Sequence, residues 1–318
     1  MRALPLLLAV IVLAAACARG GGEAREAAAP AARAKPAAFD WDHPAQATSL
    51  TADDVAARLG SFDWAAAVEW TVSREGDDAR RVHVVEHHRV HQAATGEFET
   101  RADLDPGLGA GSVSGKEVVW TGGMTYAHAR FAAWRERPTD RGRDARRFRE
   151  ESFLAPAAAA RLVGPGLEIK AAGEATVLRR TARRFVLSLA NGAPPAPPLP
   201  RPEAPAPDDD TKRRRAFLDG LRPQSATGEL LLDAATGAPL RFKLSATFTV
   251  QGDPSARTSV EVLAQVRALG GEVAAVAAPR TALPDERKAT GVANALEAAG
   301  LKKRGEDKGA AEQDDEDQ

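Results

Sequence analysis

The sequence has few of the residues that build disulfide-bonded, metal-bound or membrane-embedded proteins. It has one cysteine in 318 residues, which excludes a disulfide framework and a cysteine-based zinc site. Aromatic residues make up 5%, and the 44% hydrophobic fraction includes 68 alanines, each of which buries little area. The formal net charge is −1, which argues against a nucleic-acid partner. We therefore exclude a polytopic membrane protein and expect a packed core that covers only part of the chain.

The chain begins with a segment typical of secreted proteins. The basic start Met1-Arg2 is followed by an apolar run over 4–16, which is shorter than the roughly twenty residues that span a bilayer. This pattern predicts a signal peptide over 1–16. The end of the run, Leu13-Ala14-Ala15-Ala16-Cys17, resembles the lipobox of bacterial lipoproteins, in which the cysteine becomes the lipidated N-terminus. The alternative is ordinary cleavage after Ala16, which would leave a free cysteine.

The lipobox resemblance implies a place in the cell envelope. Cys17 would anchor the protein in a membrane, and residues 17–40, which lack apolar periodicity, would form a flexible tether. Ala18 stands where an aspartate would retain an enteric lipoprotein in the inner membrane. The resemblance therefore implies an outer-membrane lipoprotein that faces the periplasm of a Gram-negative cell.

Most of the remaining chain alternates apolar and polar residues with a period of two, which predicts half-buried antiparallel strands. A short helix is expected over 51–59, and a helical insert over 144–162 should break near Pro156. The expected elements do not alternate between strand and helix, so a parallel sheet is not expected. The expected strands cover 64–73, 80–92, 97–104, 118–121, 124–128, 167–169, 175–179, 184–189, 228–233, 240–251 and 260–266.

These elements predict a single domain over 41–284. A segment over 192–210 holds eight prolines in nineteen residues and is expected to be an insertion within that domain. Residues 285–318 are expected to form a polar tail with a short helix over 292–301 and an acidic end.

The number and length of the strands predict a curved sheet, because a long antiparallel sheet must curl. Its concave face must be filled by large side chains, helices or a ligand. We expect a mainly β (α+β) fold, a curved antiparallel half-barrel with one or two helical inserts on the concave side. Candidate residues for a ligand cavity there are Trp64, Val68, Trp70, Phe98, Trp120, Tyr126, Phe242 and Phe248. The alternative for each of them is an ordinary place in the packed core.

One stretch adds a family resemblance to this pattern. Residues 231–240, Leu-Leu-Asp-Ala-Ala-Thr-Gly-Ala-Pro-Leu, resemble a hairpin that recurs in Lol-type lipoprotein carriers and LppX-like lipoproteins. The resemblance implies a half-barrel that holds acyl chains or lipoprotein anchors on its concave side. The proline-rich insertion and the acidic tail depart from that family.

The segment from His83 to His91 is the densest group of titratable residues. His83, Glu86 and His87 match the His-x-x-Glu-His motif of a zinc protease, which requires a helix that places both histidines on one face. The neighbouring valines favour a strand instead. On a strand, His83 and His87 would stand about 13 Å apart, too far to share one metal ion. We therefore expect no metal site and no catalysis here.

The sequence thus predicts a non-catalytic, periplasm-facing lipoprotein that binds a lipid or acyl chain without a cofactor. A second hypothesis is an envelope scaffold with a filled interior that binds another protein. A third, metal-dependent hydrolysis by the histidine cluster, would need metal ligands close together.

Overall fold

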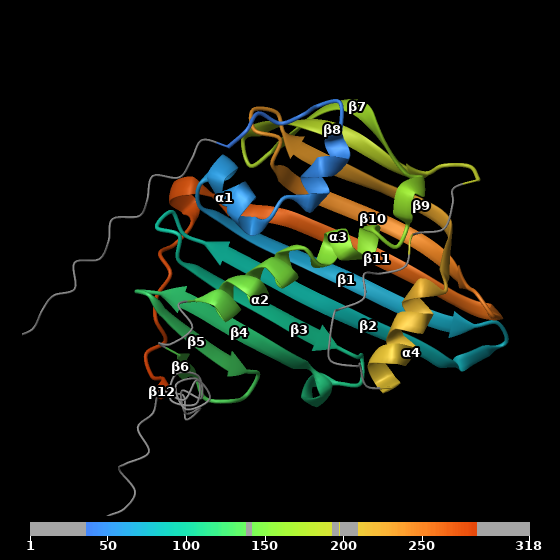
Figure 1. Ribbon diagram of the computed structural model, residues 1–318, viewed down its shortest axis with the longest axis horizontal. Coiled ribbons are helices and arrows are strands. Elements are labelled where there is room, and N and C mark those ends of the chain that lie inside the picture. The colour runs from blue at the N-terminus through green and yellow to red at the C-terminus, as the bar shows by residue number, and fades with distance from the viewer. Residues whose placement is uncertain (1–35, 138–141, 193–196, 198–208, 285–318) are drawn as a thin grey trace, which may run out of the picture. The chain divides into compact units, whose positions relative to one another are not determined.

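The strands predicted from alternation form one twelve-stranded sheet in the computed structural model, which describes residues 36–137, 142–192, 197 and 209–284 (Figure 1). The strand order is β12-β6-β5-β4-β3-β2-β1-β11-β10-β9-β8-β7. Neighbours are antiparallel except β12 and β6. The strands are β1 (Phe62–Arg74), β2 (Asp77–Gln92), β3 (Phe98–Asp105), β4 (Ser114–Thr121), β5 (Met124–Ala129), β6 (Arg135–Arg137), β7 (Leu167–Val177), β8 (Arg180–Leu189), β9 (Leu221–Asp233), β10 (Pro239–Val250), β11 (Asp253–Leu269) and β12 (Leu283–Pro284).

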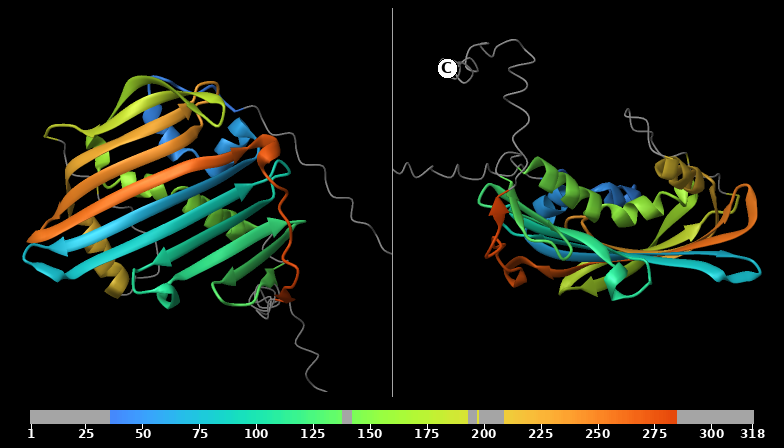
Figure 2. Two further views of the ribbon diagram at one scale, coloured as in Figure 1. Left: turned by 180° about the vertical axis from the view of Figure 1, so that it is seen from behind. Right: turned by 90° about the horizontal axis from the view of Figure 1, so that it is seen from below.

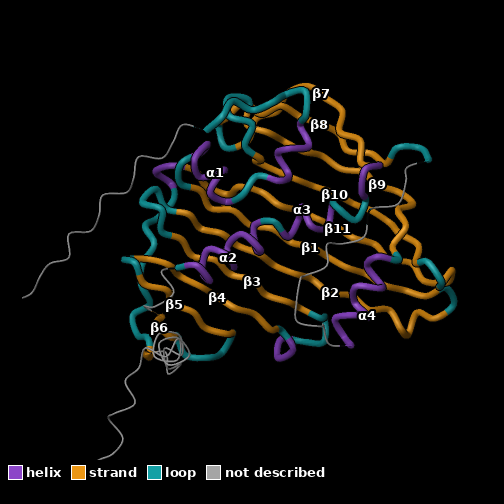
Figure 3. The backbone as a smooth tube through the Cα atoms, in the orientation of Figure 1, coloured by secondary structure: helices purple, strands orange, loops and turns teal. Residues whose placement is uncertain are grey.

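The α-helices lie on one side of this curved sheet, which is its concave face (Figure 2). Figure 3 shows them in front of the strands. Two adjacent helices, α2 and α3, cross the middle of that face (Figure 1). Among the described residues, no helix is long and apolar enough to span a membrane. The helical elements are η1 (Pro44–Ser49), α1 (Ala52–Leu59), η2 (Ala110–Ser112), α2 (Arg143–Phe153), α3 (Ala155–Ala160), η3 (Gly164–Gly166), α4 (Asp209–Asp219) and η4 (Gly270–Glu272).

Local sequence explains several boundaries. Thr51 and Asp54 form a reciprocal capping box at the start of α1. Gly122 and Gly123 both have positive φ, which allows the tight turn between β4 and β5. Leu154 separates α2 from α3 two residues before Pro156, so the predicted break is confirmed.

The core follows from the alternation. Alternate side chains on β1, β10 and β11, together with apolar side chains of β8 and β9, form the main apolar cluster beneath α1, α3 and η1. A smaller cluster lies beneath α2 on β3, β4 and β5. The predicted fold class, a mainly β curved antiparallel sheet with helices on its concave face, is confirmed.

The strands are longer than the alternation alone indicates. The two short strands expected over 167–169 and 175–179 belong to one strand, β7, which continues through a bulge between Ala171 and Glu174 and ends at Val177, before the turn at Leu178 and Arg179. Most of the 192–210 insertion, the 17–35 part of the tether and the helix expected over 292–301 lie outside the described residues.

Candidate functional site

Seven of the eight side chains predicted for a concave cavity do lie on the concave face. They are Trp64, Val68 and Trp70 on β1, Phe98 on β3, Trp120 on β4, and Phe242 and Phe248 on β10. Tyr126 lies on the opposite, convex face, because the β4–β5 hairpin pairs Trp120 with Thr125 and Val119 with Tyr126. There Tyr126 packs against a small cluster that contains Val119 and Val276. Tyr126 therefore does not face inward as predicted, because the hairpin register decides which alternate residues of β5 face the concave side.

The seven side chains do not share one space. Trp64 and Phe242 line an apolar cavity, and Trp70 lies half-buried at the edge of the main cluster. The other four are packed in the two clusters: Val68 and Phe248 in the main one, and Phe98 and Trp120 in the one beneath α2, where their rings stack.

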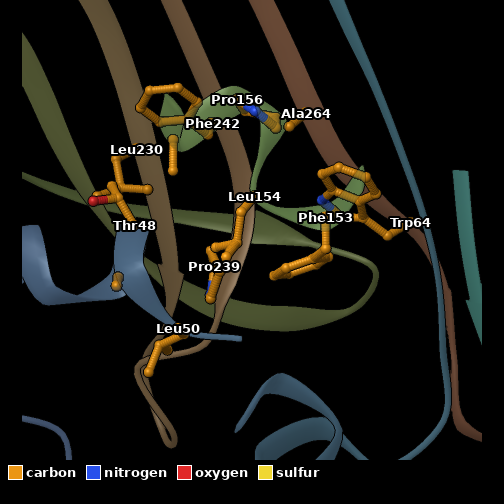
Figure 4. A pocket seen from close by; sticks show the side chains of 12 residues that line it. Thr48, Leu50, Trp64, Phe153, Leu154, Pro156, Leu230, Pro239, Phe242 and Ala264 are labelled. Carbon is orange, nitrogen blue, oxygen red and sulfur yellow. The ribbon is translucent and has the colours of Figure 1, made fainter. Parts of the chain in front are cut away.

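The apolar cavity lies between the sheet and its helical cover and has a volume of about 40 Å³ (Figure 4). One water molecule needs roughly 10–15 Å³ of space measured in this way, so the cavity holds only a few small groups. Phe153, Leu154 and Pro156 come from the α2–α3 break, and Thr48 is the one polar side chain of the lining set. The lining residues are Ala47, Thr48, Leu50, Trp64, Phe153, Leu154, Pro156, Ala157, Leu230, Pro239, Phe242 and Ala264.

The cover over this cavity is built from short elements. η1 and α3 have six residues each. Helices this short have little stability of their own, because few hydrogen bonds offset the cost of nucleation. α3 buries Pro156 and the small side chains of Ala159 and Ala160. Alanine buries little apolar area, so these contacts contribute little to holding α3 on the sheet.

By contrast, α2 is fixed by a buried charge. Arg149 is only 1% exposed. Its guanidinium donates to Gln92 Oε1 on β2 at 2.8 Å and pairs with Asp53 on α1 at 2.8 Å and Glu150 at 2.6 Å. It also lies over the Phe98 ring, 4.6 Å from the centroid. One side chain thus ties α1, α2 and the sheet together, and removing it would leave the buried Gln92 acceptor without its donor.

A polar cluster of Trp70, Glu86 and His88 lies where the covered part of the concave face ends. Glu86 pairs across the strands with buried Val68 on one side and with Leu104, which is 42% exposed, on the other. Interaction with His88 lowers the pKa of the Glu86 carboxyl despite its burial, and Arg214 of α4 and the Trp70 indole act in the same direction. This Trp70–Glu86–His88 cluster therefore holds a carboxylate beside an apolar surface.

The histidine-rich segment is part of β2, as predicted. His83, His87 and His91 lie on the convex face and Glu86 and His88 on the concave face. The His-x-x-Glu-His spacing is therefore on a strand, without the helical face that the zinc motif requires. His91 is buried, with Nε2 2.8 Å from the Ala274 carbonyl oxygen. Among the described residues, no group of three or more histidine, cysteine, aspartate or glutamate side chains could hold a metal ion.

The convex face carries a polar recess of about 440 Å³ whose floor is Ala65 and Ala67. Its walls have three arginines and three carboxylates, and several of these are already engaged: Arg89 binds Asp63 at 2.8 Å, and Arg101 binds the neighbouring Asp103 at 2.6 Å. The lining arginines and carboxylates are equal in number, so their formal charges cancel.

Sequence reasoning missed the residues that come from the cover: Phe153, Leu154, Pro156, Thr48 and Leu50. A signal was present in the apolar pair Phe153-Leu154 beside a proline in an otherwise charged helix. Cys17 and its predicted lipid anchor lie outside the described residues.

Comparison with solved structures finds similar folds. Lipoprotein LppX of Mycobacterium tuberculosis matches over 70% of this chain and 94% of its own, with 10% identity and a TM-score of 0.24. A putative outer membrane lipoprotein-sorting protein domain from Vibrio parahaemolyticus matches over 70% and 93%, with 9% identity and a TM-score of 0.22. A LolA superfamily protein from Nitrosomonas europaea matches over 70% and 97%, with 9% identity and a TM-score of 0.19.

No family model matches the sequence, and no curated protein does. The structural matches belong to the groups that residues 231–240 resemble. At these identities and TM-scores, the likeness concerns the fold alone and says nothing of a ligand.

Proposed function

We propose that this protein binds an apolar chain, a lipid or lipoprotein acyl chain, without catalysis, between the concave face of the sheet and the α3–η1 cover. The observation that carries the proposal is the apolar cavity beneath two six-residue elements, one of them rich in alanine. The chain would enter when α3 and η1 move away from the sheet, while Arg149 keeps α2 in place.

Apolar burial would supply the affinity. Each buried methylene contributes about 0.8 kcal/mol, so eight methylenes would contribute roughly 6 kcal/mol before the cost of moving the cover. Such binding has little selectivity for chain type, because the hydrophobic effect is not directional. In the cell, we propose that the lipidated Cys17 anchors the protein in the outer membrane, with this domain in the periplasm.

An envelope scaffold is the second candidate, and the filled interior favours it. In this structure a cavity of about 40 Å³ leaves no room for an acyl chain. A scaffold also needs exposed apolar side chains, and two loops carry one each. Leu108, between β3 and β4, is 82% exposed, and Phe131, after β5, is 81% exposed. Arg130, which precedes Phe131, pairs with Asp103 on β3 at 3.4 Å and donates its backbone N–H to the Gly115 carbonyl on β4.

Native mass spectrometry of the mature chain, residues 17–318, purified without detergent and then extracted with organic solvent, tests the first candidate. We expect a stoichiometric lipid mass that extraction removes. Ala264→Leu, which fills the cavity from β11, should reduce the bound fraction. The matched control Ala67→Leu lies on the convex face of β1 and should not. An apo mass that stays unchanged after incubation with lipids would overturn the carrier proposal in favour of a protein partner.

A further inference from the structure

Three buried polar atoms on the concave face lack a hydrogen bond of normal geometry. They are the indole N–H of Trp70 and both ring nitrogens of His88, although the Trp70 indole and the His88 ring both lie close enough to the Glu86 carboxyl to lower its pKa. The His88 side chain is 10% exposed, and its Nε2 lies 3.5 Å from Glu86 Oε2, longer than an ordinary hydrogen bond. A buried polar group left without a partner costs free energy, so this cluster has capacity for another hydrogen-bonding group.

The register places this cluster at the end of the apolar region. His88 lies between Ala66 on β1 and Ala102 on β3, two side chains too small to cover it. Ala66 follows Trp64, which lines the apolar cavity, by two residues on the same face of β1. An apolar chain that extends from the cavity along the concave face of β1 and β2 therefore reaches the Trp70–Glu86–His88 cluster, on the side where the concave face becomes exposed.

We propose that the Trp70–Glu86–His88 cluster binds the polar end of an amphiphile, and that this polar end is an uncharged hydroxyl group, as in a monoacylglycerol. This inference rests on the proposed function. A hydroxyl accepts one hydrogen bond and donates another, so it can accept from the Trp70 indole N–H while it donates to the Glu86 carboxylate. His88 can serve as donor or acceptor, depending on its tautomer.

The same cluster disfavours an anionic end. A carboxylate or phosphate has no hydrogen to donate to Glu86, and its charge would lie close to the charge of that side chain. Arg214 contributes positive charge near Glu86, but its side chain is exposed on α4, where solvent weakens its effect. The chemistry of the cluster therefore selects a neutral hydroxylated head over a fatty acid with the same chain.

Calorimetric titration of the mature chain with two ligands of equal chain length, monodecanoylglycerol and decanoate, tests this selection. We expect the native chain to bind monodecanoylglycerol about tenfold more tightly, a difference of about 1.4 kcal/mol. Glu86→Gln removes the charge and keeps the size, so it should bring the two affinities to within about threefold of each other. Trp70→Phe removes the indole N–H and should weaken monodecanoylglycerol binding more than decanoate binding.

Two control variants change the same residue types on the convex face. Glu69→Gln on β1 and His87→Ala on β2 should leave the ratio of the two affinities unchanged. If both ligands bind and Glu86→Gln leaves their ratio unchanged, the polar site is wrong and the apolar site stands. If neither ligand binds to the native chain, both the polar site and the proposed function are overturned.

Discussion

Phe153→Ala is the sharpest test of the packing between the helical cover and the sheet. Phe153 is 7% exposed, and its ring centroid lies 4.8 Å from that of Trp64 and 6.1 Å from that of Phe62. Replacing a buried phenylalanine with alanine costs about 3–5 kcal/mol, which includes the cavity it leaves. We expect a loss of about 3–4 kcal/mol in the free energy of unfolding, because Phe153 lies at the end of α2, where the cover can partly relax.

The enlarged cavity gives this prediction a second measurement. Removing the ring adds volume on the order of 100 Å³ to a cavity of about 40 Å³, and dry apolar cavities of that size bind small apolar molecules. Urea unfolding followed by circular dichroism, with and without toluene, measures both effects. At ten times its Kd, toluene should restore about 1.4 kcal/mol.

Phe131→Ala is the matched control, since that ring is 81% exposed and should change the free energy of unfolding by less than about 0.5 kcal/mol. A loss below about 1 kcal/mol for Phe153→Ala would refute the packing of α2 and α3 on the sheet. A full loss without rescue by toluene would show that the cover collapses into the space and that this region does not open around a ligand.

Three further changes probe separate parts of the fold. Burial would raise the pKa of Asp63, but hydrogen bonds with His91 and Arg89 outweigh burial and lower the pKa to about 2. The ionised Asp63 therefore stabilises the fold above pH 3.8, and this stabilisation is lost as the pH falls toward 2. Asp63→Asn should make the free energy of unfolding depend less on pH in that range, as measured by acid unfolding. Arg149→Met should lower the free energy of unfolding by about 1–3 kcal/mol, measured by urea titration, because it leaves the buried Gln92 acceptor without its donor and removes the partner of Glu150. Gly237→Ala should lower the thermal midpoint more than Gly252→Ala, because both glycines have positive φ but only at Gly237 would the new Cβ overlap another residue, the Phe39 ring.

Local patterns in the sequence predicted local structure well. The alternation along β1 and β10, the glycine turn before β5 and the break before Pro156 all reflect interactions between residues close in the chain. The bulge in β7 was missed because Ala171-Ala172-Gly173 offers no alternation, although the backbone continues as a strand through Gly173 at positive φ.

What the sequence could not predict depends on distant partners. β1 pairs with β11, about two hundred residues further along, and nothing in either strand alone specifies the other. The cavity is formed where residues of η1, the α2–α3 break and β9–β11 meet, so its lining could not be assembled from any one segment. Arg149 reads as part of an exposed, charge-paired helix, and only its contacts with Gln92 and Asp53 show that it is buried.

The contrast between α2 and α3 is the physical basis for where this fold can open. Arg149 ties α2 to Gln92 on β2 and to Asp53 on α1, and displacing it would leave its buried charge and the Gln92 acceptor unpaired. α3 is held by a proline and alanines, and its displacement costs only small apolar contacts. Since local opening follows the elements with the least buried area, the concave face should open beneath α3, where Trp64 and Phe242 already border a cavity. A ligand that entered there would replace the alanine contacts with contacts that bury more apolar area. The larger buried area would favour binding.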